Sequence, residues 1–246
     1  MKMLLKARKE FYWNHLRHLY HSVFDRIIEK GELPDGNSFF FRPFSSDKWV
    51  EDDIYSLQVY DGLSRPAMGC VVFDVGAHIG LFTLKASKLV GKTGLIFAIE
   101  PHPANYSLLR RNIALNSLTN VRAINAAAGA KRGRTKLYVS KSDPAGHSTV
   151  TMPDPLCKQC IEVPLLTLDD LGKDVDSERI FIKMDCEGAE LEVLRGAKRT
   201  LEKGDVTVAL SVYHSPRQKE EVEKYLRSKG FKTSTKLEGY LYARNR

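Results

Sequence analysis

From residue 70 onwards, short continuous apolar runs alternate with longer stretches that carry apolar residues at helical spacing. The runs have the length of strands, and the stretches between them have the length of helices. Continuous apolar strands separated by helices are typical of a parallel sheet covered by helices on both faces. We therefore expect an α/β, Rossmann-like three-layer fold, with strands near residues 70–75, 95–99, 121–128, 180–184 and 206–213 and helices near 81–90, 104–115, 189–201 and 218–229.

The two ends of the chain depart from this pattern. Two short runs, residues 231–235 and 240–244, predict a terminal hairpin. Near the start, a helical spacing of apolar residues predicts an amphipathic helix over residues 8–30, with its apolar positions at Leu16, Leu19, Val23 and Ile27.

The segment between this helix and the first strand, residues 34–69, is rich in turn formers and aromatic residues. This composition indicates a cap or lid with one or two short strands. We therefore divide the chain into an N-terminal extension, residues 1–69, and a main domain, residues 70–246. The helix is expected to pack on the main domain or on a second copy of the chain.

The charge and the hydropathy of the chain indicate which partners and which cellular location to expect. The net charge is +8 and the pI is near 9.2, which suits an anionic partner, although a solvated basic helix face is the alternative. No apolar run reaches the roughly 20 residues of a membrane-spanning helix, and the basic start is not followed by an apolar signal core. We expect a cytoplasmic protein.

Residues 71–80 run from an apolar strand through a glycine turn into a helix. Gly76 and Gly80 allow a sharp turn and let a ligand approach the helix N-terminus. Asp74 ends the strand and is able to accept a hydrogen bond from an ammonium group, and Glu100 ends the next strand, where a carboxylate reaches ribose hydroxyls. These residues predict a nucleoside with an amino-acid tail; a helix cap at Asp74 and a surface charge at Glu100 are the alternative interpretation.

At this point the sequence resembles the FkbM-type methyltransferases, a branch of the class I enzymes that depend on S-adenosylmethionine. The resemblance covers about residues 70–214 and implies a seven-stranded sheet with a reversed last strand. It also implies S-adenosylmethionine as donor and, often, O-methylation of a hydroxyl on a sugar, glycan or small metabolite. It rests on four motifs in order: FDVGAHIG (73–80), IEPHPANYSLLRRNIALN (99–116), VPLLTLDDL (163–171) and IKMDCEGAELEVLRGA (182–197).

Carried onto this chain, the resemblance assigns contacts with the donor along these motifs. The glycine turn would hold the methionine end, Glu100 the ribose and residues 125–128 the adenine. No acidic residue stands in this last segment to bind the adenine amino group, so backbone groups are expected to serve instead. The expected donor contacts are Asp74, Gly76, Ala77, His78, Gly80, Glu100, Pro101, Ala126, Ala127 and Asp185.

The expected catalytic residues are Asp185, Glu187 and His214, which follow two neighbouring parallel strands at the edge where open α/β sheets place ligands. A hydroxyl acceptor must lose a proton, so a nearby carboxylate or imidazole is required as a base. Glu187 is alternatively a partner of the next helix dipole, and His214 a turn residue. His147 is a candidate lid residue, and Asp169 either orients a loop or contacts substrate.

Metal binding is an alternative that the sequence does not predict. Asp185, Glu187 and His214 form the donor set that a divalent cation would need. Cys157 and Cys160 have CxxC spacing, but a structural zinc needs four ligands and no second pair accompanies them. A plain loop is favoured there over a zinc or redox site.

Three other functions remain as alternatives. An RNA acceptor would use the basic residues Lys131, Arg132, Arg134 and Lys136 with the basic N-terminal helix. A dehydrogenase with NAD is disfavoured, since His78 stands where the dinucleotide fingerprint has its second glycine. A non-catalytic nucleoside-binding protein is disfavoured by the carboxylates at both strand ends.

Overall fold

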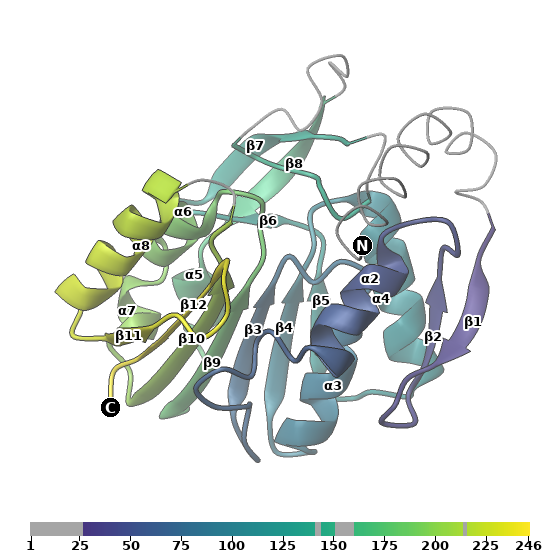
Figure 1. Cartoon of the computed structure of the whole chain (residues 1–246), viewed down its shortest axis with the longest axis horizontal. Helices are drawn as coiled ribbons and strands as arrows, with labels where there is room; N and C mark the ends of the chain where they lie inside the picture. The colour runs from purple at the N-terminus through teal and green to yellow at the C-terminus, as the bar shows by residue number, and fades with distance from the viewer. Residues whose placement is uncertain (1–26, 141–143, 151–159, 214–215) are drawn as a thin grey trace, which may run out of the picture.

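The computed structural model describes residues 27–140, 144–150, 160–213 and 216–246, and its centre is a seven-stranded sheet (Figure 1). The order is β11-β12-β10-β9-β3-β4-β5. Strand β12, Tyr240–Arg244, runs antiparallel to both of its neighbours, β10 and β11 (Lys232–Ser234). The mostly parallel sheet with a reversed last strand is confirmed; its parallel strands are β3 (Val71–Val75), β4 (Leu95–Ile99), β5 (Val121–Ile124), β9 (Arg179–Met184) and β10 (Asp205–Ser211).

Helices cover both faces of this sheet and enclose two apolar cores (Figure 1). Strand side chains alternate in direction, so Phe73 of β3 enters one core and Val72 enters the other. The core around Phe73 is closed by α5 (Leu168–Leu171), α6 (Glu190–Arg195), α7 (Lys198–Leu201) and α8 (Pro216–Ser228). The core around Val72 is closed by α3 (Leu81–Val90) and α4 (Pro103–Leu115).

The predicted strand at residues 121–128 is two strands in different sheets. Strand β5 ends at Ile124, and β6, Ala127–Ala128, joins a second sheet of order β6-β8-β7 with β7 (Gly133–Tyr138) and β8 (Cys160–Leu166). The side-chain amide of Asn125 donates to the carbonyls of Glu100 and Pro101, which holds the chain at the break. The small sheet was not predicted because exposed charged residues interrupt the apolar pattern of β7.

The predicted helix at residues 189–201 is also divided, into α6 and α7, at Gly196. A side chain at this position would come within 2.0 Å of the Gly129 carbonyl oxygen. The backbone therefore passes so close to the start of the small sheet that only glycine fits, and the helix is interrupted there.

The described N-terminal residues form what we call the cap, residues 29–60. It contains a hairpin of β1 (Glu29–Glu32) and β2 (Ser38–Phe41), then α2 (Asp47–Glu51) and a π-helical turn, η1 (Asp52–Ser56). The prediction of a helix over residues 8–30 is wrong at its end, because Glu29 and Lys30 belong to strand β1 and pair with β2. Strand β2 buries Phe39 and Phe41. Residues 8–26 of that helix lie outside the described residues.

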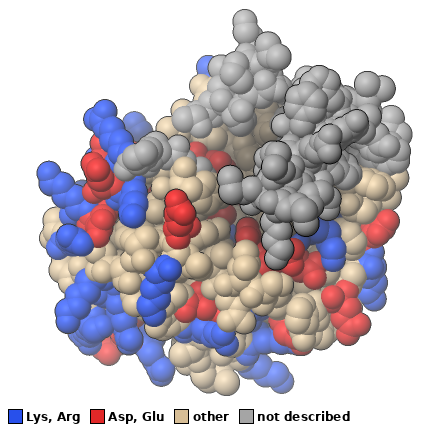
Figure 2. Space-filling model, viewed as in Figure 1, with Lys and Arg blue, Asp and Glu red and all other residues tan. Residues whose placement is uncertain are grey.

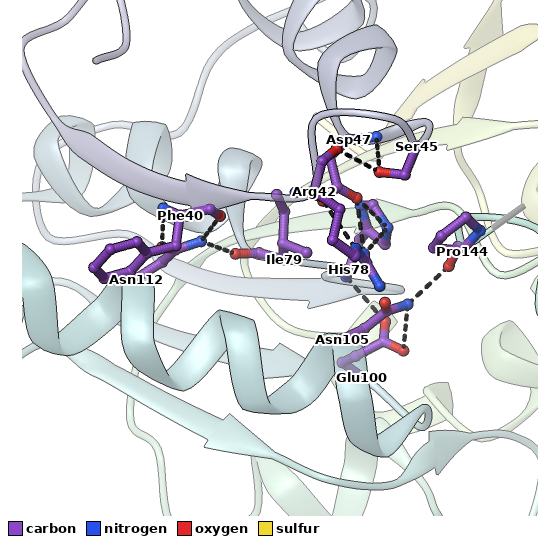
Figure 3. Close-up of polar contacts among 10 residues, drawn as sticks. All are labelled: Phe40, Arg42, Ser45, Asp47, His78, Ile79, Glu100, Asn105, Asn112 and Pro144. Carbon is purple, nitrogen blue, oxygen red and sulfur yellow. Dashed lines mark hydrogen bonds and ion pairs between the residues drawn. The ribbon is translucent and has the colours of Figure 1, made fainter. Parts of the chain in front are cut away.

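The cap is attached to α4 by side chains that bond to the backbone of β2 (Figure 3). The Asn112 amide accepts from the Phe40 N–H at 2.6 Å and donates to the Phe40 and Ile79 carbonyls at 3.1 and 2.8 Å. Asn116, one turn along, bonds in the same way to both backbone groups of Ser38. Asn112 is completely buried, so its amide links the cap, α4 and the start of α3.

Charges of both signs are interspersed on one face of the molecule. On the face drawn in Figure 2, Lys and Arg lie mainly at the left and lower edges and are interspersed with Asp and Glu. Within the described ranges, no helix combines the length and apolar character needed to cross a bilayer.

Replacing Asn112 with Ala is expected to destabilise the protein by about 2 to 3 kcal/mol, because the buried carbonyl of Ile79 and the partly buried backbone groups of Phe40 lose their partners. Urea denaturation measures this change. Asn116→Ala, at a half-buried position with the same type of contact, is the matched control and is expected to cost less. Equal losses would contradict the assignment of Asn112 as the central link.

Candidate active site

A cavity of about 390 Å³ lies at the carboxyl ends of β3, β4 and β9, bordered on its outer side by the cap. Open parallel sheets bind ligands at this edge. The main domain contributes Gly76, Ala77, His78, Phe82, Glu100, Pro101, Asn105, Pro144, Ala145, Gly146, His147, Lys183, Asp185, Glu187 and Tyr213, and the cap contributes Ser46, Trp49, Val50, Asp53, Ile54 and Tyr60. The structure thus brings together most of the residues that the sequence predicts for the site.

The glycine turn after β3 packs directly against the end of β9. Gly76 has a φ of 71°, and a side chain on it would lie 1.8 Å from the Asp185 carbonyl oxygen. The N–H groups of Gly76 and Ala77 both donate to the Ile99 carbonyl at 3.0 Å. Any residue other than glycine would therefore separate the two strand ends that form the floor of the cavity.

Asp74 does not line the cavity. Its carboxylate is completely buried, accepts a hydrogen bond from Thr83 Oγ1 at 2.6 Å, and lies 3.1 Å from Lys183 Nζ. The same ammonium donates to the Gly76 carbonyl at 2.7 Å, and Lys183 does line the cavity. Asp74 thus stands behind the glycine turn and supports it through Lys183 and Thr83.

Glu100 is buried at the end of β4 and lines the cavity (Figure 3). Its carboxylate accepts from the backbone N–H groups of His78 and His102, each at 2.9 Å. Burial raises the pKa of Glu100 from its ordinary 4.5 to about 7, and these N–H donors oppose that rise. The carboxylate is therefore poised between its charged and neutral forms near neutral pH.

Asp185 lies at the opposite side of the cavity and accepts three hydroxyl donors. Tyr60 Oη and Ser211 Oγ donate at 2.7 Å each, and Tyr213 Oη at 3.4 Å. Burial raises the pKa of both tyrosines, so their hydroxyls remain protonated donors. The oxygens of Asp185 are thus largely occupied by the protein itself.

Glu187 also lines the cavity, in a turn with left-handed backbone at Glu187 (φ 53°) and Gly188 (φ 101°). A positive φ at a residue other than glycine is strained, and such strain clusters at functional sites. Ser148 Oγ donates to the Glu187 carbonyl at 2.7 Å and fixes the turn. The predicted His214 lies outside the described residues.

Asp53, on the π-helical turn of the cap, is a cavity residue that the sequence analysis missed. Among the described residues, no hydrogen bond or ion pair involves its carboxylate. Burial raises the pKa of Asp53, and the charges of Asp185 and Asp52 add to this. The feature that points to Asp53 is the π-helical turn, a conformation frequent at functional sites. This turn cannot be recognised from the sequence.

A second, smaller cavity of about 30 Å³ lies beside the first, over the ends of β3, β4 and β5. Four of the predicted donor contacts line it, namely Gly76, Pro101, Ala126 and Ala127. Gly76, Pro101 and His147 line both cavities. Its other lining residues are mainly apolar, so it has the character of a narrow apolar slot.

An ionic network connects the cap with the glycine turn (Figure 3). Asp47 is completely buried, pairs with Arg42 at 2.8 Å, and lies 3.3 Å from His78 Nε2. Burial alone would raise the pKa of Asp47, but His78 and Arg42 together hold it below its ordinary value. The cap therefore holds His78, a residue of the glycine turn that lines the cavity.

The remaining candidates lie away from the cavity or outside the described residues. Asp169 accepts from the Thr200 N–H and Oγ1 at 2.8 Å each, so it links α5 to α7. Cys160 is exposed at the start of β8, whereas Cys157 is not described. In the part of the chain that the structure describes, no three His, Cys, Asp or Glu residues are grouped to hold a metal ion.

Comparison with known proteins identifies relatives of this chain. The family model described as the methyltransferase FkbM domain matches residues 74–233, well over half of the chain. Methyltransferase 1 of Beauveria bassiana is 29% identical over 191 residues, which cover 69% of this chain and 76% of that protein. Methyltransferase sdnD of Sordaria araneosa is 28% identical over 214 residues, covering 75% and 82%.

Among solved structures, methyltransferase FkbM from Methylobacillus flagellatus superposes with a TM-score of 0.53 at 23% identity. The match covers 74% of this chain and 45% of that chain, so this protein spans less than half of that structure. The likeness confirms the Rossmann-like fold.

The raised pKa of Glu100 predicts a pH-dependent stability in the ligand-free protein. A carboxyl whose folded pKa exceeds its unfolded value contributes stability below about pH 4.5, and this is lost as the pH rises through about 7. Between pH 5 and pH 8 the loss is about 2 to 3 kcal/mol.

Urea denaturation of the wild type and Glu100→Gln across this range measures the effect. The variant removes the titration, so its stability is expected to change less with pH than that of the wild type. Parallel curves for the two proteins would show that Glu100 does not titrate in this range.

Proposed function

The chain belongs to the FkbM methyltransferase family, and from this premise we propose that it transfers the methyl group of S-adenosylmethionine to a hydroxyl of a sugar, glycan or small metabolite. The observation that carries the proposal is the placement of a glycine turn and a buried carboxylate at neighbouring strand ends of one cavity. A nucleoside with an amino-acid tail matches that pair. The division into an N-terminal extension, residues 1–69, and a methyltransferase domain, residues 70–246, is part of the same proposal.

Buried polar atoms at the cavity support the fit of an adenosine group. Asn105 donates from Nδ2 to the Pro144 carbonyl at 2.8 Å and lies 3.5 Å from a Glu100 oxygen, which fixes the orientation of its amide (Figure 3). Its Oδ1 is buried and has no hydrogen-bond partner among the described residues. Glu100 and Asn105 together would accept hydrogen bonds from the ribose hydroxyls, and Gly76, Ala77 and His78 would hold the methionine end.

The acceptor half of the cavity combines apolar walls with two carboxyl groups. Val50 and Ile54 from the cap and Phe82 from α3 form apolar wall, and Asp53 and Asp185 lie among them. Trp49 and Tyr213 line the cavity yet are 57% and 53% exposed, so they stand at its mouth. This mixture supports an acceptor with an apolar body and a polar reacting group.

The donor supplies a methyl group on a positive sulfur and leaves as a neutral thioether. The acceptor oxygen forms its new bond to that carbon as the carbon–sulfur pair returns to sulfur, and the hydroxyl proton must go to a base. We assign the proton to Asp53, because Asp185 already accepts three hydroxyls whereas Asp53 accepts none among the described residues. Asp185 and Glu187 would then orient the acceptor, together with the undescribed His214.

Binding of S-adenosylhomocysteine, the product of the donor, tests the proposal. It is expected to raise the melting temperature, with no effect of NAD. Glu100→Ala is expected to weaken binding about 10- to 100-fold, because a charge-assisted contact with the ribose is lost. Calorimetry measures the affinity, and an absence of binding by the wild type would exclude S-adenosylmethionine as donor.

The acceptor is identified by incubating the enzyme with methyl-tritiated donor and fractions of cell extract. Label in a sugar, glycan or small metabolite is the expected result. Label in RNA would favour the alternative that the basic residues Lys131, Arg132, Arg134 and Lys136 suggest, and retention on RNA would then be sensitive to salt.

With that acceptor, Asp53→Asn is expected to lower kcat about 100-fold and to leave the affinity for S-adenosylhomocysteine unchanged. Wild-type activity should fall as the pH drops and Asp53 gains its proton, and the variant should lose this limb of the profile. The titratable groups that act on Asp53 are Asp52, Asp185 and Tyr240. Asp52→Asn, at the exposed neighbouring carboxylate, is the control; equal losses in both variants would exclude the assignment.

Two further expectations stay proposals. A cytoplasmic location is tested by imaging the tagged full chain, and a homo-oligomer formed through the N-terminal helix is tested by sedimentation of the full chain. A bound divalent cation, which we do not propose, would appear as loss of activity on chelation.

A further inference from the structure

His147 occupies a position that neither the family match nor the catalytic assignment explains. It lies in the segment between β7 and β8 and, like Gly76 and Pro101, lines both the larger cavity and the apolar slot. Its imidazole contacts that of His102, with ring centroids 3.9 Å apart and an interplanar angle of 39°. His102 precedes α4 and follows Glu100 by two residues, so His147 lies close to the predicted ribose site.

The hydrogen bonds of His147 define which of its nitrogens carries a proton. The backbone N–H of Ser140 donates to Nδ1 at 3.0 Å, and a backbone N–H is only ever a donor. Nδ1 is therefore unprotonated, and Nε2 carries the hydrogen in the neutral ring. Burial, with a smaller contribution from His102, lowers the pKa of His147 to about 2, so the ring is neutral at physiological pH.

The Nε2–H group of this ring is a buried donor without an acceptor. Within the described part of the chain, Nε2 is shielded from solvent and makes no hydrogen bond. Such a donor is costly, and native structures retain one mainly where a ligand or water completes it. The group therefore indicates a hydrogen-bond acceptor that the described residues do not supply.

The segment that carries His147 is anchored to the site. The backbone groups of Tyr138 and Ser148 bond to each other in both directions, and Ser148 Oγ donates to the Glu187 carbonyl. Ser148 is buried, and its neighbour is thereby held at a defined position relative to the turn after β9. The backbone that carries His147 is thus held at a fixed position beside both cavities.

The mainly apolar lining of the slot suits the faces of a planar heterocycle. Pro101, Ala126 and Ala127 form its wall, and no acidic side chain is among the lining residues that the structure describes. Among these residues, no carboxylate would be present to accept a hydrogen bond from the amino group of an adenine in this slot. Its ring nitrogens N1, N3 and N7 are unprotonated acceptors in adenine, and an N–H donor is their complement.

We propose that His147 is a specificity residue for the methyl donor, which donates a hydrogen bond from Nε2 to an unprotonated ring nitrogen of the adenine. The inference rests on the proposed use of S-adenosylmethionine. It explains how a chain without an acidic residue after β5 recognises the base, and it gives the segment before β8 a role in donor selection.

The test measures by calorimetry the binding of S-adenosylhomocysteine and its 1-deaza, 3-deaza and 7-deaza analogues, in each of which one ring nitrogen is replaced by C–H. The wild type is expected to bind one analogue about 10-fold more weakly than the parent compound. His147→Phe keeps a ring against His102 but lacks the N–H. It is expected to bind the parent about 10-fold more weakly and to lose the discrimination against that analogue.

A second readout separates recognition from a purely structural role. His147→Phe loses the Nδ1 acceptor of the Ser140 N–H but also removes the unpartnered Nε2 donor. These two effects oppose each other, so the melting temperature of the ligand-free variant is expected to stay close to that of the wild type. Discrimination that persists in the variant, or equal binding of all four compounds by the wild type, would overturn the proposal. So would normal donor affinity in the variant with an increased KM for the acceptor, since His147 would then contact the acceptor.

Failure of the proposed function has a different signature. If S-adenosylhomocysteine does not bind to the wild type at all, the donor assignment and this inference both fail. If it binds and His147→Phe binds all four compounds like the wild type, only the role of His147 fails.

Discussion

The ammonium of Lys183 connects the central strand ends on which the site is built. It is buried near the end of β9 and lies within hydrogen-bonding or ion-pairing reach of Asp74, the Val75 carbonyl and the Gly76 carbonyl. A buried ammonium is tolerated only when charge and hydrogen bonds compensate it, so these oxygens must stay together. The position of the glycine turn, and with it the floor of the cavity, follows from this contact and from the close approach of Gly76 to Asp185.

Much of the main domain could be predicted because its strands are apolar on both faces. Each residue of β3 is buried, and such a run is recognisable without knowledge of its partners. The glycine turn and Glu100 were predictable for a related reason, since they follow such runs directly. The role of Asp74 was harder, because strand position alone does not reveal that Thr83 and Lys183 occupy its oxygens.

The cap and the small sheet could not be predicted in the same way. Strand β1 is almost entirely exposed, and β7 contains exposed charged residues. Both strands therefore form because they pair with a neighbouring strand, and neither has an apolar pattern that would reveal it in the sequence. Asp53 and Tyr60 enter the site only because η1 and the segment after it fold back on the sheet ends. Side chains brought together by tertiary contacts carry no local signal in the sequence.

The way in which α4 holds the cap has a consequence for which cap residues tolerate substitution. Asn112 and Asn116 bond to backbone N–H and carbonyl groups of β2, which every residue except proline provides, rather than to particular side chains. Outward-facing side chains of the hairpin are therefore replaceable without loss of these backbone contacts to α4. Substitutions on the outer face of the hairpin therefore leave the lining of the cavity unchanged, since the cap residues in that lining come from α2, η1 and the residues beside them.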